Sequence, residues 1–370
     1  MSLGRDAVVA DVDPLACLLT RAKCTPVDPG RLVSSIETLF EVVGRSGYRA
    51  DVGITPTEAI AELEQSTPYR APTNVFHWFH PTIARDMARL LLALWDYRTR
   101  LEPPLFDAVL AVIAASIRRV SRADPKPVSG LEVTSVRLRK LSLGLRFDLQ
   151  REVLARAALL GEGYSQLLNI PSLGGVQVSR SNAKDWARVC KSNGWLPTVQ
   201  VTSPPYLKAI DYPRRHKLEY SWLGLINRDQ IRVRSHEFLG VDVIRDRDFL
   251  KGDLSLPDPA MNCCKRVSQA STERAGLVVE QYFADLRDWM GEVSRVAGEA
   301  DGVAYVVVGP SSVAGVAVDT PAILPQLASD LGLTLTKSRW HRVVNHRMQY
   351  TLRTGGRIDK EAVLCFKPDN

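Results

Sequence analysis

The chain of 370 residues is long enough to bury a large hydrophobic core and predicts two or three domains. Hydrophobic residues make up 45%, charged residues 24%, and the net charge of +7 permits binding to nucleic-acid phosphates without establishing it. The longest apolar run, residues 108–117, is too short to span a bilayer, and no secretion signal is evident. We therefore expect a cytoplasmic protein with no membrane segment.

The cysteines show no metal-ligand spacing, and the adjacent pair among them suits neither a zinc site nor an easy disulfide. We expect reduced, mostly structural thiols and no metal site. The six are Cys17, Cys24, Cys190, Cys263, Cys264 and Cys365.

Residues 6–13 predict a buried strand that ends in acids, and Pro14 opens a helix in its favoured first turn. A carboxylate at the end of a strand in a nucleotide-binding sheet commonly binds ribose hydroxyls. Asp11 is the first candidate for this role and Asp13 the second. The alternative is structural for both acids, and for Asp13 it is capping of the following helix.

Residues 31–165 predict a mostly helical block. Thr55 and Glu58 form a capping box with proline between them, and further helices are expected at about 105–120 and 147–160. The aromatic cluster at 76–80 contains two histidines, and we favour core packing over a metal site there because no acids or cysteines accompany them. Residues 176–178 then predict a short strand.

Residues 198–201 predict a buried strand that runs into Thr202–Tyr206, where two prolines end it because neither can donate a ladder hydrogen bond. This elbow presents a hydroxyl acceptor on Ser203, the free carbonyl of Pro204 and the aromatic plane of Tyr206. Two acceptors that hold the hydrogens of an exocyclic amine would aim its lone pair at an electrophile. An aromatic face would stack on a base removed from its helix. The alternative is a Pro-Pro turn with a packed tyrosine.

Thr202–Tyr206 resembles the catalytic motif of the amino-group DNA methyltransferases, in the Ser-Pro-Pro-Tyr form typical of cytosine-N4 enzymes. The continuation through 209–214 and 222–224 is similar to one bacterial branch of that family. The resemblance implies that Ser203 and the Pro204 carbonyl hold the target amine, that Tyr206 stacks on the flipped base, and that Pro205 completes the motif.

The resemblance also implies S-adenosylmethionine as cofactor and DNA as substrate. Residues 11–16 resemble the family's second motif, whose acid holds the ribose of the cofactor, which favours Asp11 and then Asp13. The element at Asn182 and Ala183 corresponds to one that meets the adenine, although an aspartate is usual at Asn182. An amide oxygen can still accept from an adenine amine. The alternative for Asn182 is a helix N-cap.

The family's glycine-rich cofactor loop normally precedes the second motif, and residues 1–5 leave no room for it. The glycines at 161–163 follow a predicted helix and not a strand, those at 174–175 have the wrong flanking residues, and those at 309–315 follow a strand but come late in the chain. In the implied fold, the missing first strand lies between the strands at 6–13 and 198–201, which would expose unpaired backbone. We therefore predict a split enzyme in which a second polypeptide supplies the strand and loop. A misassigned start codon or a decayed gene would leave the same sequence.

Two basic stretches are predicted to contact DNA phosphates. The first lies in the helical block, where DNA recognition is expected, and the second follows the elbow; their members are Arg118, Arg119, Arg214, Arg215 and Lys217. For any single arginine the alternative is an ordinary solvated face. His216 lies in the second stretch, but amine methylation needs no strong base, so we do not expect that role. Residues 226–275 predict a mobile, charged loop.

The remaining elements are a helix at 277–296, a strand at 304–308, a helix at 320–331 and a closing pair of strands at 333–336 and 361–366. The fold class predicted is a doubly wound α/β methyltransferase sheet with a large helical insertion. Its domains are residues 1–30, the first part of the methyltransferase domain; 31–165, the insertion; and 166–370, the remainder.

The predicted reaction is direct methyl transfer to the amine. No cysteine follows a proline, as the thiolate of 5-methylcytosine enzymes does in their family, so covalent catalysis fits less well. Cytosine N4 is preferred because the elbow begins with serine, and adenine N6 is the alternative. The rival from another class is a non-catalytic nucleic-acid-binding subunit that has lost cofactor binding, and an RNA methyltransferase is a third option.

Overall fold

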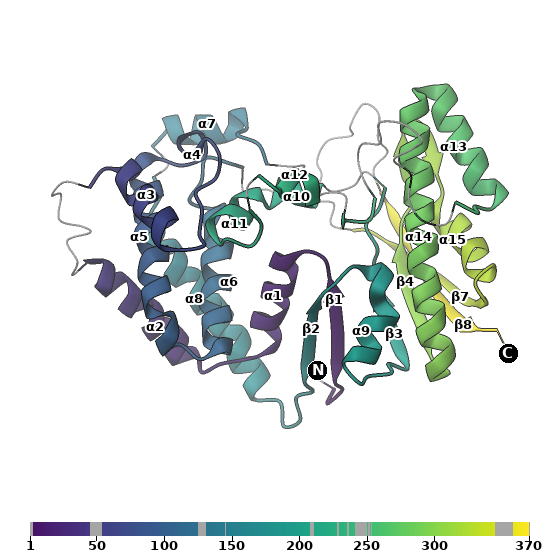
Figure 1. The fold of residues 1–370 in the computed structure, drawn as a ribbon, viewed down its shortest axis with the longest axis horizontal. Helices are drawn as coiled ribbons and strands as arrows, with labels where there is room; N and C mark the ends of the chain where they lie inside the picture. The colour runs from purple at the N-terminus through teal and green to yellow at the C-terminus, as the bar shows by residue number, and fades with distance from the viewer. Residues whose placement is uncertain are drawn as a thin grey trace. The chain divides into compact units, whose positions relative to one another are not determined.

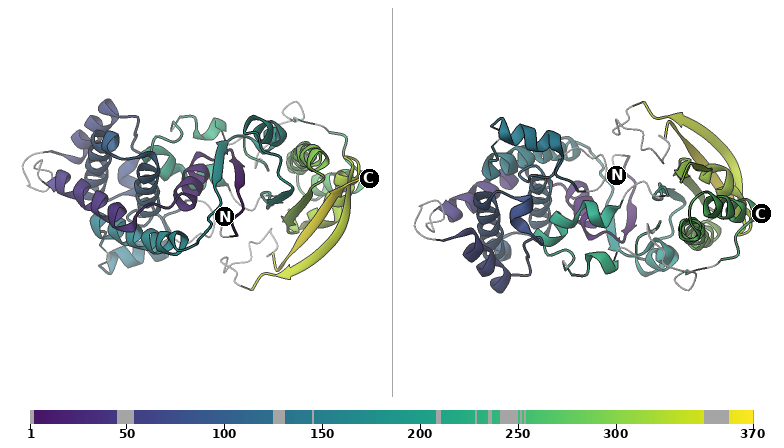
Figure 2. Two further views of the ribbon diagram at one scale, coloured as in Figure 1. Left: turned by 90° about the horizontal axis from the view of Figure 1, so that it is seen from below. Right: turned by 90° about the horizontal axis from the view of Figure 1, so that it is seen from above.

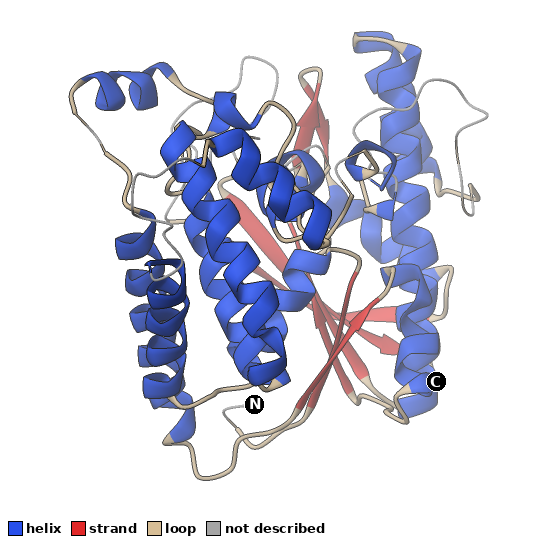
Figure 3. Cartoon of the chain, turned by 60° about the vertical axis from the view of Figure 1, so that its left-hand side comes forward, coloured by secondary structure: helices blue, strands red, loops and turns tan. Residues whose placement is uncertain are grey.

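The chain has a mixed α/β structure in which helix dominates (Figure 3). The computed structural model describes residues 3–44, 54–124, 131–144, 146–207, 211–227, 229–234, 237–240, 250, 252, 254–344 and 358–369. The chain divides into two compact units, each with its own hydrophobic core. The first comprises Met1–Val9, Asp13–Val178 and Tyr212–Val233, and the second comprises Ala10–Val12, Ser179–Asp211 and Arg234–Asn370.

The first unit is helical, and α2, α5, α6 and α8 pack side by side at its centre (Figure 1). Several of its helices begin with proline in the first turn, and the predicted capping box of Thr55 and Glu58 is confirmed. Its helices are α1 (Pro14–Cys24), α2 (Pro29–Val43), α3 (Pro56–Ser66), α4 (Val75–Trp78), α5 (Pro81–Tyr97), η2 (Arg98–Arg100), α6 (Pro103–Ile117), α7 (Ser135–Ser142), α8 (Leu149–Leu168), α10 (Tyr212–Arg215) and α11 (Lys217–Trp222). A short helix, α12 (Ile231–Arg234), ends at the unit boundary.

The helical core extends beyond the predicted insertion at 31–165. Leu18 of α1 and Trp222 of α11 are both fully buried in it, so segments before and after that block complete it. Burial of two large apolar side chains stabilises this arrangement by several kcal/mol, at about 2 kcal/mol each.

The second unit is built on a four-stranded sheet in the order β3-β4-β8-β7. β3 and β4 are parallel, and β8 pairs antiparallel with both β4 and β7, which confirms the predicted closing pair of strands (Figure 2). Its elements are η3 (Ala183–Asp185), α9 (Trp186–Ser192), β3 (Val199–Thr202), α13 (Asp258–Ala270), α14 (Glu273–Ala300), β4 (Val303–Val308), β5 (Ser311–Val313), β6 (Val316–Val318), α15 (Thr320–Ser329), β7 (Leu333–Arg342) and β8 (Lys360–Pro368).

One face of the four-stranded sheet is buried under α14 and α15. Ala304, Val306 and Val308 alternate along β4 on this face, and all three are fully buried. Their period of two is that of a strand with one face in the core. β3 contributes Gln200 to the same side, where its amide donates to the carbonyl of Val293 on α14 (3.1 Å).

A separate two-stranded sheet pairs β1 (Ala7–Asp11) with β2 (Val176–Arg180). The Ala7 N–H donates to the Gly175 carbonyl (2.9 Å) and the Ser181 N–H to the Asp11 carbonyl (3.1 Å), which is a parallel pattern. The predicted strands at 6–13 and 198–201 are thus both present, and among the described residues they belong to different sheets.

The three glycine clusters considered for the cofactor loop have other structures. Gly161 and Gly163 lie inside α8, and Gly174 lies in the loop before β2. Residues 314–315 form the two-residue turn of the β5–β6 hairpin, where both backbones have positive φ, as such turns require.

We expect Gly174→Ala to destabilise the first unit by about 2 kcal/mol, because a Cβ there would lie 2.0 Å from the Arg5 carbonyl oxygen and the backbone must move. Urea unfolding measures the change. Gly163→Ala is the matched control: nothing lies within 4 Å of its Cβ. It should stabilise α8 by about 0.5–1 kcal/mol. Equal stability of Gly174→Ala and the parent chain would contradict the close approach.

The predicted charged loop at 226–275 is wrong in part. Residues 258–270 form α13, which begins with Pro259 in its first turn and buries Cys263 and Cys264 against the second core. The alternating Arg-Asp stretch at 245–248 lies outside the described residues. No helix of the described ranges is long and apolar enough to cross a membrane.

Candidate active site

The elbow that follows β3 has two buried residues and an exposed serine. Pro204 is buried and Leu207 is packed in the second core, whereas Ser203 is exposed and Tyr206 half-buried. Since neither proline has an N–H, the chain leaves the strand here without breaking a hydrogen-bonded ladder. The elbow is therefore a fixed corner that keeps the Ser203 hydroxyl accessible.

The Tyr206 phenol interacts with side chains on either side of it. Burial raises the pKa of Tyr206, a hydrogen bond from Ser203 lowers it, and a hydrogen bond with Glu361 raises it again. A donor stabilises the phenolate, and an acceptor stabilises the neutral phenol. We infer that the Ser203 O–H donates to Tyr206, whose O–H donates to the Glu361 carboxylate. This arrangement leaves the lone pairs of Ser203 free to accept.

Gly309 packs closely against the Tyr206 ring. It follows β4, and a Cβ at Gly309 would lie 3.3 Å from Tyr206 Cε2 and 3.1 Å from a methyl carbon of Ile358. A side chain there would press on the ring, so glycine permits this packing. Neither Gly309 nor Glu361 was predicted as a site residue.

The two candidate ribose acids have different environments. Asp11 ends β1 and is half-buried, and its backbone carbonyl accepts from Ser181. Asp13 is buried and caps α1, because its Oδ1 accepts the Leu15 N–H at 2.7 Å. Its Oδ2 lies 3.2 Å from His216 Nδ1. The structure thus gives Asp13 the capping role that the sequence offered as its alternative.

Burial raises the pKa of Asp13, but the hydrogen bond and charge of His216, with further hydrogen bonds from Leu15 and Tyr220, outweigh this and hold it below its usual value. A carboxyl group with a lowered folded-state pKa stabilises the fold fully above the unfolded-state pKa. This stabilisation is lost as the pH falls through the folded-state value. The chain should therefore lose part of its stability in acid.

We expect Asp13→Asn to keep the cap and to lose this acid-dependent part of the stability. Asp13→Ala should also lose the cap, at a cost of about 1 kcal/mol at neutral pH. Urea unfolding at neutral pH and in acid measures both. An Asp13→Asn variant with the parent's full acid dependence would show that another group is responsible.

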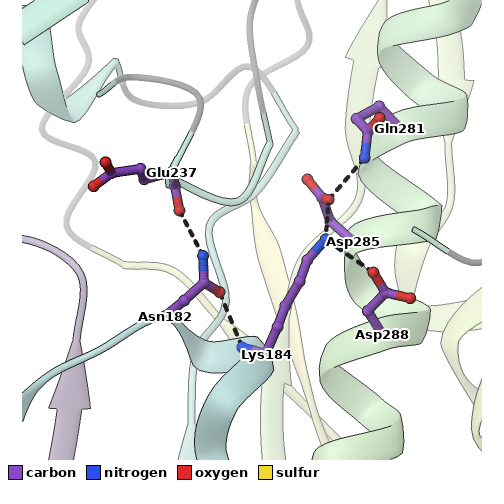
Figure 4. Close-up of polar contacts among 6 residues, drawn as sticks. All are labelled: Asn182, Lys184, Glu237, Gln281, Asp285 and Asp288. Carbon is purple, nitrogen blue, oxygen red and sulfur yellow. Dashed lines mark hydrogen bonds and ion pairs between the residues drawn. The ribbon is translucent and has the colours of Figure 1, made fainter. Parts of the chain in front are cut away.

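Asn182 also has a local structural role (Figure 4). Its Oδ1 accepts the Lys184 N–H at 3.0 Å and caps η3, which begins at Ala183, while its amide N–H donates to the Glu237 carbonyl. A carbonyl oxygen has two lone pairs, so the cap leaves one acceptor position. This chain can therefore use Asn182 as both cap and ligand.

Lys184 ties η3 to α14 (Figure 4). Its Nζ lies 2.7 Å from Asp285 Oδ1 and 3.0 Å from Asp288 Oδ2, and Gln281 also donates to Asp285. Burial lowers the pKa of Lys184, but the two carboxylates raise it more, so the ammonium stays charged. Burial raises the pKa of Asp285 above its usual value despite the lysine.

The five predicted DNA-binding residues all belong to the first unit. Three have intramolecular partners: Arg118 donates to the Asp124 carbonyl, Arg119 pairs with Glu152 at 3.3 Å, and Arg214 lies 3.7 Å from Glu132. The ion pairs of Arg119 and Arg214 are exposed and weak enough to exchange for phosphates, whereas the Arg118 contact is partly buried.

The other two predicted residues are more constrained. Lys217 lies over the Trp78 ring, 4.4 Å from its centroid, and burial with the nearby Arg214 lowers its pKa. Arg215 lies near the buried Glu219, whose pKa is raised by desolvation. No local pattern indicated this buried acid, since Glu219 lies in an ordinary helical pattern.

The aromatic cluster at 76–80 packs in the core only in part: Trp78 and Phe79 are buried, as predicted, whereas Phe76, His77 and His80 are exposed. His80 caps α5 with its ring.

A surface pocket of about 690 Å³ in the first unit is lined in part by Phe76, His77 and Asp229, and no elbow residue lines it. No group of three potential ligands among the described residues is placed to hold a metal.

Comparison with known proteins finds similarity to a named methyltransferase. No family model matches the chain, and no solved structure matches it. The chain is 18% identical over 358 residues to Type II methyltransferase M.MvaI of Kocuria varians. The alignment covers 93% of this chain and 74% of that protein. Over nearly its whole length, the chain is therefore similar to a type II methyltransferase.

Proposed function

We propose that the chain is a DNA methyltransferase that transfers the methyl group of S-adenosylmethionine to the exocyclic amine of a flipped base, with cytosine N4 as the preferred target. The observation that carries this is the elbow, because an accessible Ser203 follows a strand at a proline corner and Tyr206 lies beside it. The length of the similarity to a type II methyltransferase supports methyl transfer in general. We further propose that the two sheets belong to one doubly wound methyltransferase fold.

The elbow residues would act by holding the amine. Ser203 accepts one amine hydrogen, because its own proton is directed to Tyr206, and the Pro204 carbonyl accepts the other. An amine held by two acceptors is more pyramidal, and its lone pair is directed away from them. The Tyr206 ring stacks on the base, and Glu361 is a positioning residue that orients the hydroxyls. Most of the rate acceleration would come from this fixed geometry.

S-adenosylmethionine would supply an electrophilic methyl group. The described residues fit its adenosine half: Asp11 ends β1 and would accept from the ribose hydroxyls, and Asn182 and Ala183 lie at the end of β2. For the methionine half they offer no strand followed by a glycine-rich turn. We propose that a second polypeptide supplies this part, and that Arg118, Arg119, Arg214, Arg215 and Lys217 contact the DNA backbone.

The test is methylation of duplex DNA with S-adenosylmethionine labelled in the methyl group, by the chain as isolated from its native cells together with whatever it binds. Nucleosides from digested DNA are then separated by chromatography and mass spectrometry. We expect N4-methylcytosine; N6-methyladenine instead would assign the alternative target. An RNA substrate tests the third possibility. DNA binding without label in any nucleoside would reject catalysis and favour the binding subunit.

A further inference from the structure

β3 ends the four-stranded sheet, although it is a parallel strand. It pairs with β4 in the register Val199 to Val303 and Val201 to Tyr305, and among the described residues no strand pairs with its other edge. Parallel strands are usually found inside sheets with both faces covered. An open edge presents unpaired N–H and carbonyl groups that favour addition of another strand.

The face of the sheet opposite α14 is apolar and poorly covered near β3. Val199, Val201 and Tyr305 point to this face, and their exposed fractions are 43%, 73% and 38%. Gln200 and Ala304, which alternate with them, are buried on the other face. A neighbouring group of large exposed apolar side chains in one sheet marks an interaction surface. An added strand alone would not cover it, but a helix with an apolar side would.

The β1–β2 sheet also lacks neighbouring strands among the described residues. It has two parallel strands, and every residue of β1 is only half-buried. Two strands are marginally stable without a third strand or a packed helix. The β1–β2 sheet and the four-stranded sheet therefore each end in an apolar parallel strand that lacks a neighbour among the described residues.

We propose that the open edge of β3 and the exposed face formed by Val199, Val201 and Tyr305 bind a second polypeptide through a strand, a glycine turn and a helix with an apolar side. The strand adds parallel to β3, and the helix covers the exposed face. The glycine turn rests on the proposed function, since it would complete the methionine half of the cofactor site.

A second copy of this chain fits the surface less well. Two copies related by a twofold axis would pair their β3 edges antiparallel. Such a pair adds no helix to the exposed face, and Val201 and Tyr305 would stay uncovered. A different polypeptide satisfies both the edge and the face.

The experiment is photo-crosslinking in the native host. A photoreactive benzoylphenylalanine is placed at Val201 of the full chain, and the peptides crosslinked on irradiation are identified by mass spectrometry. We expect one polypeptide other than this chain, crosslinked within a segment that contains an apolar strand, a glycine turn and a helix. The same probe at Leu159, an exposed apolar residue of α8, is the control and should not crosslink to that segment.

The identified pair is then purified, and Val201→Lys should lower recovery of the partner by about tenfold or more, because a charge would be buried at the centre of the contact. The side chain is largely exposed in the unpaired chain, so folding should persist. Crosslinks to a second copy of this chain, or none to any protein, would overturn the proposal. Methylation by the chain alone would overturn it while leaving the function intact. A complex of the expected kind that methylates nothing would support the surface and reject the function.

Discussion

Replacing Ser203 by alanine should lower the rate of methyl transfer to DNA by about a hundredfold or more, with DNA affinity and stability unchanged. In the proposed mechanism the hydroxyl is one of the two acceptors that hold the amine, and loss of one preorganised hydrogen-bonding group in a catalytic site costs about 100- to 1000-fold. Because Ser203 is exposed, its truncation leaves no cavity and no buried polar atom. Single-turnover methylation with saturating DNA separates the chemical step from binding.

Ser192→Ala is the matched control, since it makes the same chemical change on the exposed end of α9 in the same unit. Tyr206→Phe and Tyr206→Ala then separate the hydroxyl from the ring. The first should reduce the rate moderately by freeing the Ser203 proton, and the second should also lose stacking of the base, worth about 1–3 kcal/mol. A Ser203→Ala enzyme with the parent's rate would remove the elbow from the mechanism.

Replacing Lys184 by methionine should destabilise the second unit by about 3 kcal/mol at neutral pH, because it leaves two largely buried carboxylates without their cation. The effect should depend on pH. The folded-state pKa of Asp285 is already raised, and removal of the lysine raises it further. Such a group favours the fold below its unfolded-state pKa, and this contribution is lost as the pH rises through the folded-state value.

The difference in unfolding free energy between Lys184→Met and the parent chain should therefore shrink as the pH falls toward the pKa of Asp285 in the variant. Urea unfolding in mild acid and at neutral pH measures this. Adding Asp285→Asn to Lys184→Met should restore part of the neutral-pH stability, since one unpaired charge is removed. A loss that does not vary with pH would indicate that Lys184 acts through its packing and not through its charge.

Local signals predicted most of the secondary structure. Proline in the first turn marked α1, the capping box marked α3, and runs of β-branched residues marked β3 and β4. These signals depend on neighbours within a few residues, so a sequence shows them directly. The same kind of signal at Pro259 was missed because the charged composition around α13 indicated a loop.

Contacts between distant segments were not predictable. Glu361 lies near the start of β8 and reaches Tyr206 only because β8 pairs with β4, and Lys184 contacts Asp285 across 101 residues. No local pattern links these partners. The elbow residues could be proposed from the sequence because the groups that would hold the amine are adjacent in one short stretch, whereas Glu361, proposed to orient them, comes from another strand.

Trp186 is an intrinsic fluorescent group whose surroundings depend on β3, because its indole is hydrogen-bonded to the buried amide of Gln200. The Trp186 indole N–H donates to Gln200 Oε1 at 2.7 Å, and Gln200 lies on β3 between Val199 and Val201. A shift of that strand would alter the polarity around one indole and hence its emission wavelength. Events at this edge of the sheet should then change part of the combined emission of the seven tryptophans in the unlabelled protein. Gln200→Leu, which removes the hydrogen bond to Trp186, should remove that change.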